Sequence, residues 1–218
     1  MLIDIHVHTA ASRDSRAKVE DYLKMATQAD SGLSAICLTE HRLYRAGDDG
    51  ASTRLFDRYG VRVFQGIEAD TDLGHLILLG VTSSIARAYD LTERMLSGAS
   101  LISAIDSEGG LAVPAHPFRD SGFGANLKYL VEKTSGALRA IEAVNGQNAP
   151  GENARALAAA EALGLVALGG SDAHHASSKW FLTVATQLDR QVSTLGEVCS
   201  EIRAGRARPH CFDGHQLF

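Results

Sequence analysis

The sequence contains no uninterrupted run of about 18 or more apolar residues, so it offers no segment that could span a membrane as a helix. Its first residues, Met1-Leu2-Ile3-Asp4-Ile5-His6, have neither a basic stretch nor a continuous apolar core, and we expect no secretory signal. Cysteine is scarce, because Cys37, Cys199 and Cys211 are an odd number without paired spacing. We therefore expect no disulfide framework and predict a cytoplasmic protein.

The sequence also lacks an excess of positive charge. It has 21 Lys and Arg against 26 Asp and Glu, a net charge of −5, which argues against binding long nucleic acid by bulk electrostatics. No proline-rich linker, charge block or repeat divides the 218 residues, of which 45% are hydrophobic. This composition predicts one soluble globular domain with a sizeable core. From about residue 206 onward the sequence predicts an irregular tail.

Short apolar runs alternate with amphipathic stretches along the chain. Seven or eight strands are expected, within residues 2–8, 34–39, 61–67, 75–81, 111–115, 138–144, 165–168 and 181–186. Helices are expected over residues 19–29, 51–59, 95–105, 127–131 and 156–163, and after a capping box formed by Thr194 and Glu197. This alternation predicts an α/β fold with a parallel sheet, either doubly wound or closed into a barrel.

Histidine is the abundant feature in this otherwise plain composition. Six of the nine histidines lie at or near expected strand ends, and His6 and His8 stand two apart, so both point to one face. Because the carboxyl ends of parallel strands line one crevice, we expect these side chains to converge. His75 opens its strand, so it reaches that crevice only from an antiparallel or neighbouring short strand. The candidate metal ligands are His6, His8, Asp14, His41, Glu68, His75, His116, Asp172 and His174.

The types of these residues point to metal chemistry. Neutral imidazoles and carboxylates are the usual protein ligands of zinc, manganese and iron. Nine candidates are too many for one ion and suit two or three, and clustered ions suit the hydrolysis of phosphate esters. Each motif alone would also fit half-buried histidines or solvated carboxylates with ordinary hydrogen bonds. Their joint occurrence at successive strand ends favours a metal site.

Eight short motifs occur in order along the chain: Asp4-Ile5-His6-Val7-His8-Thr9, Ser12-Arg13-Asp14, Leu38-Thr39-Glu40-His41, Gly66-Ile67-Glu68, Gly74-His75-Leu76, Ala115-His116-Pro117-Phe118-Arg119, Ile141-Glu142-Ala143-Val144-Asn145-Gly146 and Gly170-Ser171-Asp172-Ala173-His174. Together they resemble the motifs of the PHP (polymerase and histidinol phosphatase) superfamily over nearly the whole chain. One departure is Glu40, which stands where that superfamily usually has aspartate and which bears on the orientation of His41.

The resemblance implies a distorted (β/α)7 barrel, a single domain over residues 1–218, and a trinuclear site with two or three divalent manganese, iron or zinc ions. It assigns the first ion to His6, His8, Glu68 and Asp172, the second to Glu68, His75 and His116, and the third to Asp14, His41 and His174. The expected reaction is hydrolysis of a small phosphate ester by a hydroxide that bridges two ions, with nucleotide-derived esters among the candidate substrates.

Three further residues are candidates for contact with the substrate. Arg119, just past His116, is placed to bind a phosphoryl oxygen and is counted with Glu68 and Asp172 as catalytic; the alternative is a surface arginine at a turn. Arg13 is a weaker candidate of the same kind. Asn145 either orients the substrate or caps a turn with the glycine that follows it.

Two other functions remain open. The first is an amidohydrolase-type metallohydrolase, which also begins with a His-x-His pair; Glu68 at a mid-chain strand end and the final Asp172–His174 pair favour the phosphoesterase. The second is a non-catalytic, metal-binding accessory protein, although the chain keeps every candidate ligand. The sequence leaves open which ester is cleaved, whether it is a monoester or a diester, which metal binds and the oligomeric state.

Overall fold

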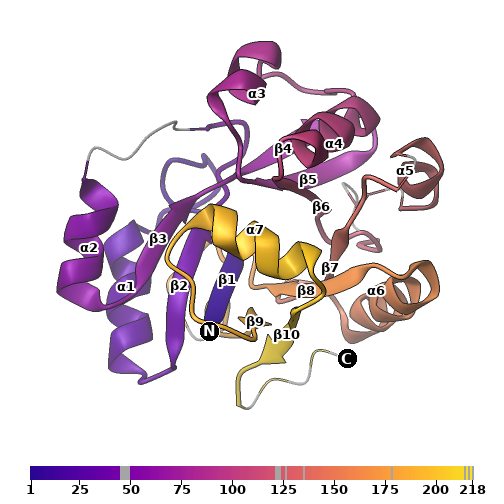
Figure 1. Ribbon diagram of the computed structural model, residues 1–218. Helices are drawn as coiled ribbons and strands as arrows, with labels where there is room; N and C mark the ends of the chain where they lie inside the picture. The colour runs from indigo at the N-terminus through magenta and orange to yellow at the C-terminus, as the bar shows by residue number, and fades with distance from the viewer. Residues whose placement is uncertain are drawn as a thin grey trace.

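The computed structural model describes residues 1–44, 50–120, 124–125, 127–134, 136–177, 179–213, 215 and 217, and it has a mixed α/β architecture (Figure 1). Its strands are β1 (Leu2–Val7), β2 (Leu33–Leu38), β3 (Arg62–Gln65), β4 (Ile67–Thr71), β5 (Gly74–Leu79), β6 (Leu111–Pro114), β7 (Ala140–Asn145), β8 (Val166–Gly170), β9 (Val184–Leu188) and β10 (Ala207–Cys211). Its helices are α1 (Val19–Gln28), α2 (Ala51–Tyr59), α3 (Ser83–Ala88), α4 (Gly98–Ser107), α5 (Leu127–Thr134), α6 (Pro150–Leu163) and α7 (Leu195–Arg203).

The described strands form three sheets. The largest has the order β10-β9-β1-β2-β3, the second has the order β4-β5-β6, and β7 pairs with β8 alone. The pairs β1–β2, β2–β3 and β7–β8 are parallel, whereas β4, β5 and β6 run antiparallel to their neighbours, as do β9 and β10. None of the three sheets closes on itself, so the described strands do not show the closed barrel that the resemblance implies.

Isolated bridges nevertheless join the sheets around a common centre. A bridge between Val7 and Ala173 connects the segment after β8 to β1, and another between His41 and Glu68 connects the segment after β2 to β4. β6 also lies beside β7. The ends of β1, β2, β4, β6, β7 and β8 therefore surround one region, which is where the predicted ligands meet.

The expected strand over residues 61–67 is two strands, because the chain changes partners at Gly66. β3 pairs with β2, whereas β4 pairs with β5. A Cβ atom at Gly66 would lie 2.9 Å from the carbonyl oxygen of Leu78, so only glycine fits this crossing. Glu68 consequently lies inside β4. β5 runs antiparallel to β4 and pairs His75 with Asp70, which confirms the antiparallel strand that His75 requires.

Two other expectations were wrong. The tail is not irregular from residue 206, because Ala207–Cys211 forms β10 and pairs along the outer edge of β9. This strand carries no apolar alternation, so the free edge of β9 decides its structure rather than its own sequence. The helix expected from Met95 begins instead at Gly98, and Met95 is 69% exposed with a φ of 59°.

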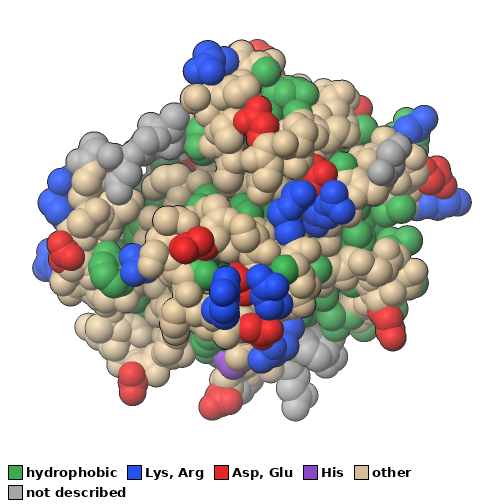
Figure 2. All heavy atoms as spheres, in the orientation of Figure 1, with side chains coloured by type: hydrophobic (Ala, Val, Ile, Leu, Met, Phe, Trp, Pro, Cys, Tyr) green, Lys and Arg blue, Asp and Glu red, His purple; other side chains and the backbone are tan. Residues whose placement is uncertain are grey.

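The hydrophobic core fills the end of the strands that lies away from the predicted ligands. In β5, Leu76 and Leu78 pack toward α4, and Ile77 and Leu79 pack toward α7. α7 lies across the end at which β1 begins (Figure 1). On that face hardly any histidine side chain is visible (Figure 2). The predicted capping box holds, since the Thr194 hydroxyl accepts a hydrogen bond from the backbone of Glu197 at the start of α7.

Within the described ranges, no helix is long and apolar enough to cross a membrane. The longest of them, α6, has 14 residues and ends at Gly164, which has a φ of 64°. Cys37, Cys199 and Cys211 are free.

Candidate metal centre

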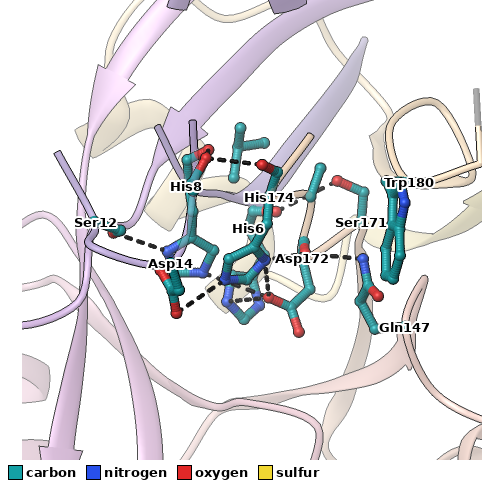
Figure 3. A network of polar contacts seen from close by, with 12 residues as sticks. His6, His8, Ser12, Asp14, Gln147, Ser171, Asp172, His174 and Trp180 are labelled. Carbon is teal, nitrogen blue, oxygen red and sulfur yellow. Dashed lines mark hydrogen bonds and ion pairs between the residues drawn. The ribbon is translucent and has the colours of Figure 1, made fainter. Parts of the chain in front are cut away.

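Four buried side chains from three parts of the chain point at one position. The Nε2 atoms of His6 and His8, both fully buried, lie 3.4 and 3.3 Å from Oε2 of Glu68. Both also lie 3.4 Å from Oδ1 of Asp172. Figure 3 shows His6, His8 and Asp172 turned toward one another at the end of β1. The first predicted ligand set is therefore assembled in space.

These residues fit a bound cation. The Nε2 atoms of His6 and His8 and Oε2 of Glu68 are buried, and none makes a hydrogen bond within the described part of the chain. Buried polar atoms without partners are costly, and most native proteins satisfy them. A divalent ion among these lone pairs would satisfy all of them at once, and this donor set of imidazoles and carboxylates suits zinc, manganese or iron.

Glu68 divides its two carboxylate oxygens between two groups of histidines. Oε2 faces His6 and His8, whereas Oε1 lies 2.9 Å from Nδ1 of His75 and 3.1 Å from Nε2 of His116. A buried carboxylate with a separate set of imidazoles on each oxygen has the form of a bridging ligand. The second predicted set is thus adjacent to the first.

The third predicted set lies toward the surface. Oδ2 of Asp14, a side chain that is 53% exposed, lies 3.2 Å from Nε2 of His41 and 3.4 Å from Nε2 of His174. His41 also lies 3.0 Å from Glu68 through Nδ1, so the three sets are continuous. All nine predicted ligands therefore come together. The triads whose ligand atoms all lie within 4.8 Å of one another are His6–His8–Glu68, His41–Glu68–His75 and His8–His41–His174.

The close packing of imidazoles and carboxylates shifts their titration. Burial lowers the pKa of His8, but the nearby carboxylates of Asp172 and Glu68 outweigh it and raise that pKa to about 9. Burial raises the pKa of Glu68 and Asp172, but the charge of His6 and the neighbouring imidazoles hold both values well below the usual range. His174, which is displaced toward the rim, has its pKa lowered by burial and by His8. Without metal, these shifts favour a charged His8 beside charged Glu68 and Asp172.

Two of the predicted ligands have an uncommon backbone conformation. His116 has a φ of 33° and Asp172 a φ of 55°, both in the left-handed region, where side chains cost of order 1–3 kcal/mol. The segment that follows β8 is therefore not extended at Asp172. The chain turns at Asp172, and Nδ1 of His174 lies 2.9 Å from the Asp172 carbonyl oxygen, which leaves Nε2 facing Asp14.

Arg119 and Asn145 both reach the centre. Arg119 donates from Nη2 to Asp172 at 2.8 Å and to the Asn145 side chain at 2.7 Å, and from Nε to Asn148 at 2.9 Å. Asn145 is fully buried, and its amide group donates to Glu142 and to Asp172 within the protein. These contacts favour a positioning role for Asn145, and its contact with the substrate stays a prediction.

Arg13 lies outside the buried cluster. It is exposed and lines a hollow of about 520 Å³ whose wall also contains Asp14, His41, Arg42 and Thr92. Arg42 is held by an ion pair with Asp70. The hollow therefore opens onto the third ligand set and has two arginines on its wall.

Glu40 was expected to bear on the orientation of His41, but its side chain contacts Thr9 and Ser12 instead. Its carboxylate accepts hydrogen bonds from the hydroxyls of Thr9 and Ser12. The same Ser12 hydroxyl lies 3.3 Å from Nδ1 of His8 and accepts a hydrogen bond from the backbone of His41. The glutamate at this position therefore supports His8 through its side-chain contacts and His41 only through the backbone.

Glu142 is not among the predicted site residues, although it lies against the candidate ligand His6. Its carboxylate is fully buried in β7 and lies 2.8 Å from Nδ1 of His6. The available signal was one ionisable residue in the otherwise apolar run Ile141-Glu142-Ala143-Val144, since glutamate is almost never fully buried unless it is paired.

Residues 4–134 match the PHP domain family, and residues 150–207 match the family described as PHP-associated. The centre of this fold brings together groups of histidine and glutamate side chains that could hold metal ions. Because the first match covers more than half of the chain, the protein belongs to the PHP domain family.

One curated protein and several solved structures are similar to this chain. An uncharacterised protein of Methanocaldococcus jannaschii is 29% identical over 128 residues, which are 54% of this chain and 68% of that protein. PsfC of Pseudomonas syringae PB-5123 shares the fold with a TM-score of 0.71 and 22% identity, over 97% of this chain and 91% of that one.

Two further solved structures share the fold at lower identity. A protein of Bifidobacterium adolescentis described as a metal-dependent phosphoesterase aligns with a TM-score of 0.58 and 19% identity, over 79% of this chain and 87% of that one. The lesion-specific endonuclease PfuEndoQ of Pyrococcus furiosus aligns with a TM-score of 0.63 and 14% identity, over 95% of this chain and 57% of that one. At these identities the likeness concerns the fold alone.

Proposed function

We propose that this protein is a metal-dependent phosphoesterase that hydrolyses a small phosphate ester, with nucleotide-derived esters among the candidates. The observation that carries the proposal is the position of Glu68, whose two buried oxygens face separate sets of imidazoles 2.9–3.4 Å away. Such an arrangement suits neighbouring cations that share one carboxylate, and paired cations suit in-line displacement at phosphorus.

The ligands divide into three sets in this proposal. The first ion would be held by His6, His8, Glu68 and Asp172, the second by Glu68, His75 and His116, and the third by Asp14, His41 and His174. Divalent manganese, iron or zinc ions there would supply Lewis-acid stabilisation of phosphoryl charge and activation of water for attack on phosphorus.

The remaining residues of the site would bind and orient the anionic substrate. Arg119 keeps its guanidinium beside Asp172 with the side chain 18% exposed, so it would bind a phosphoryl oxygen at the edge of the metal centre. Arg13 and Arg42 lie on the wall of the hollow outside Asp14, where they would attract the rest of the anion. Asn145 would hold Arg119 in this position through its side-chain oxygen.

The direct test is an activity screen of the purified protein with manganese supplied. The panel would contain chromogenic phosphate monoesters and diesters, mononucleotides, bisphosphates, cyclic nucleotides, short oligonucleotides and histidinol phosphate, beside amides and lactones. We expect turnover of phosphate esters only. Hydrolysis of an amide or lactone without a phosphate ester would instead identify an amidohydrolase, and no turnover of any compound would favour the accessory role.

Variants connect that activity to the centre. Metal analysis of the wild-type protein should give more than one equivalent, and the double substitution His6→Ala with His8→Ala should abolish phosphoesterase activity. His210→Ala is the matched control, because His210 lies in β10 and contacts Phe212 rather than the cluster. Full activity in the double variant would contradict the proposal.

A further inference from the structure

We propose that Glu142 is a positioning residue that determines which nitrogen His6 offers to a metal ion and couples His6 to His116. The inference deepens the proposed function and rests on it, since it concerns the same metal centre. Its basis is the set of hydrogen bonds around one carboxylate that is 0% exposed.

All three partners of the Glu142 carboxylate approach it as donors. Oε1 lies 2.8 Å from Nδ1 of His6, and Oε2 accepts hydrogen bonds from the backbone N–H of His116 at 2.8 Å and from the side-chain amide of Asn145 at 2.9 Å. A carboxylate only accepts hydrogen bonds, so it satisfies all three. An imidazole that donates from Nδ1 keeps a lone pair on Nε2, the nitrogen that faces Glu68 and Asp172.

The same carboxylate connects ligands from different strands. His6 belongs to β1, and His116 follows β6 with a backbone in the left-handed region. Asn145 extends the network, since its amide also lies 3.4 Å from Asp172 and its oxygen accepts from Arg119. Glu142 therefore connects His6 of the first predicted ligand set with His116 of the second. Through Asn145 in β7 it also contacts the group that holds Arg119 and Asp172.

The Glu142 carboxylate is also closely packed against a neighbouring strand. A Cβ atom on Gly170 would lie 2.5 Å from Oε1 of Glu142, so the glycine of β8 packs directly against the carboxylate. Replacing Glu142 by glutamine would set an NH2 group against at least one of the donors that now meet an oxygen. Because Glu142 is 0% exposed, bulk solvent does not reach the groups that would then conflict.

The test is a metal titration that does not depend on turnover. Zinc binding to wild type, Glu142→Gln and Glu201→Gln would be measured by competition with a chromogenic chelator. Glu201 is the matched control, because it is also 0% exposed and paired, with Arg190 and Arg206, but lies on α7 away from the cluster. We expect roughly 10–100-fold weaker zinc binding for Glu142→Gln and wild-type affinity for Glu201→Gln.

The outcomes separate this inference from the proposed function. If the wild-type protein binds none of zinc, manganese and iron, the proposed function fails; if wild type and Glu142→Gln bind zinc equally, the positioning role of Glu142 is overturned. A second measurement covers the case in which Glu142→Gln does not fold. In 15N NMR spectra of the zinc-loaded wild-type protein, His6 should carry its proton on Nδ1, and zinc coordination through that nitrogen would overturn the inference.

Discussion

At the scale of single residues, the chemistry of this centre depends on how neighbouring groups shift the pKa of each buried side chain. His8 and Glu68 are taken out of water, which penalises the charge on each. Asp172 and Glu68 nevertheless shift the pKa of His8 toward its charged form, and the charge of His6 does the same for Glu68. Such opposed shifts cluster at functional sites. A metal ion that binds here replaces protons, because a coordinating imidazole must be neutral.

Metal binding should therefore release protons at neutral pH. The pKa of His8 is raised to about 9, so in the metal-free protein this residue is protonated at pH 7 and must lose its proton when a metal binds. Calorimetric zinc titrations in buffers of different ionisation enthalpy would measure this release. We expect release of at least one proton per protein at pH 7, falling as the pH approaches 9. A binding enthalpy that is independent of the buffer at pH 7 would contradict the assignment.

The same shift predicts how stability depends on pH without metal. The pKa of His8 in the folded protein lies above its usual value of 6.5, so protonated His8 contributes stability that is complete below pH 6.5 and is lost as the pH rises through about 9. Urea unfolding in the presence of a chelator should show falling stability over that window. The zinc-loaded protein should not show this loss, and equal slopes for both forms would contradict the prediction.

At the scale of whole elements, close approaches between strands hold the ligands in register. Gly170 at the end of β8 faces both Glu142 and His6, because a Cβ atom there would lie 2.5 Å from Oε1 of Glu142 and 2.7 Å from Cβ of His6. β7, β8 and β1 can therefore meet behind the metal centre only if this residue has no side chain. The glycine is part of the site although it has no functional group.

Gly170→Ala should therefore weaken both the fold and the centre. We expect a loss of about 1–3 kcal/mol in the free energy of unfolding, the usual cost of overpacking, together with weaker zinc binding. Gly151→Ala in α6 is the control, because a Cβ atom there would meet nothing within 4 Å. Urea unfolding and chelator competition would measure the two effects. If Gly170→Ala has the same free energy of unfolding as the control, β7, β8 and β1 tolerate a side chain at this position and the prediction is contradicted.

Tyr22 of α1 joins the segments that follow β1 and β8. Its buried hydroxyl lies 2.8 Å from the carbonyl oxygen of His8 and 2.9 Å from that of Ala173. We expect Tyr22→Phe to cost about 1 kcal/mol of stability. Tyr59→Phe is the matched control, because the Tyr59 hydroxyl is buried with no hydrogen-bond partner among the described residues. Thermal unfolding would compare them, and equal melting temperatures for both variants would contradict the role of Tyr22.

At the scale of the whole molecule, the two family matches do not correspond to two independent units. β1 belongs to the first match, yet it pairs with β9 of the second, and Val7 forms a bridge with Ala173. Asp172 lies 3.4 Å from His6, and His174 lies 3.4 Å from Asp14, so the predicted ligand sets draw on both matched regions. The metal centre therefore requires both parts of the chain.

A fragment of residues 1–134 should consequently not fold alone. It would lose the partners of β1 on one side and expose buried residues such as Ile3 and Ile5. Amide NMR spectra of this fragment should show the narrow dispersion of an unfolded chain, whereas the full chain should show a dispersed spectrum and one cooperative unfolding transition. A dispersed spectrum from the fragment would contradict the prediction of a single domain.

The sequence by itself determined the α/β character of the chain and its candidate ligands, because strand periodicity and the chemistry of histidine and carboxylate side chains are local properties. The helix start at Thr194 and the helix end at Gly164 were predictable for the same reason. Contacts between distant segments decided the rest. Only the tertiary structure places Glu142 against His6, divides the strand at Gly66 and pairs β10 with β9, since each depends on a partner far away in the sequence.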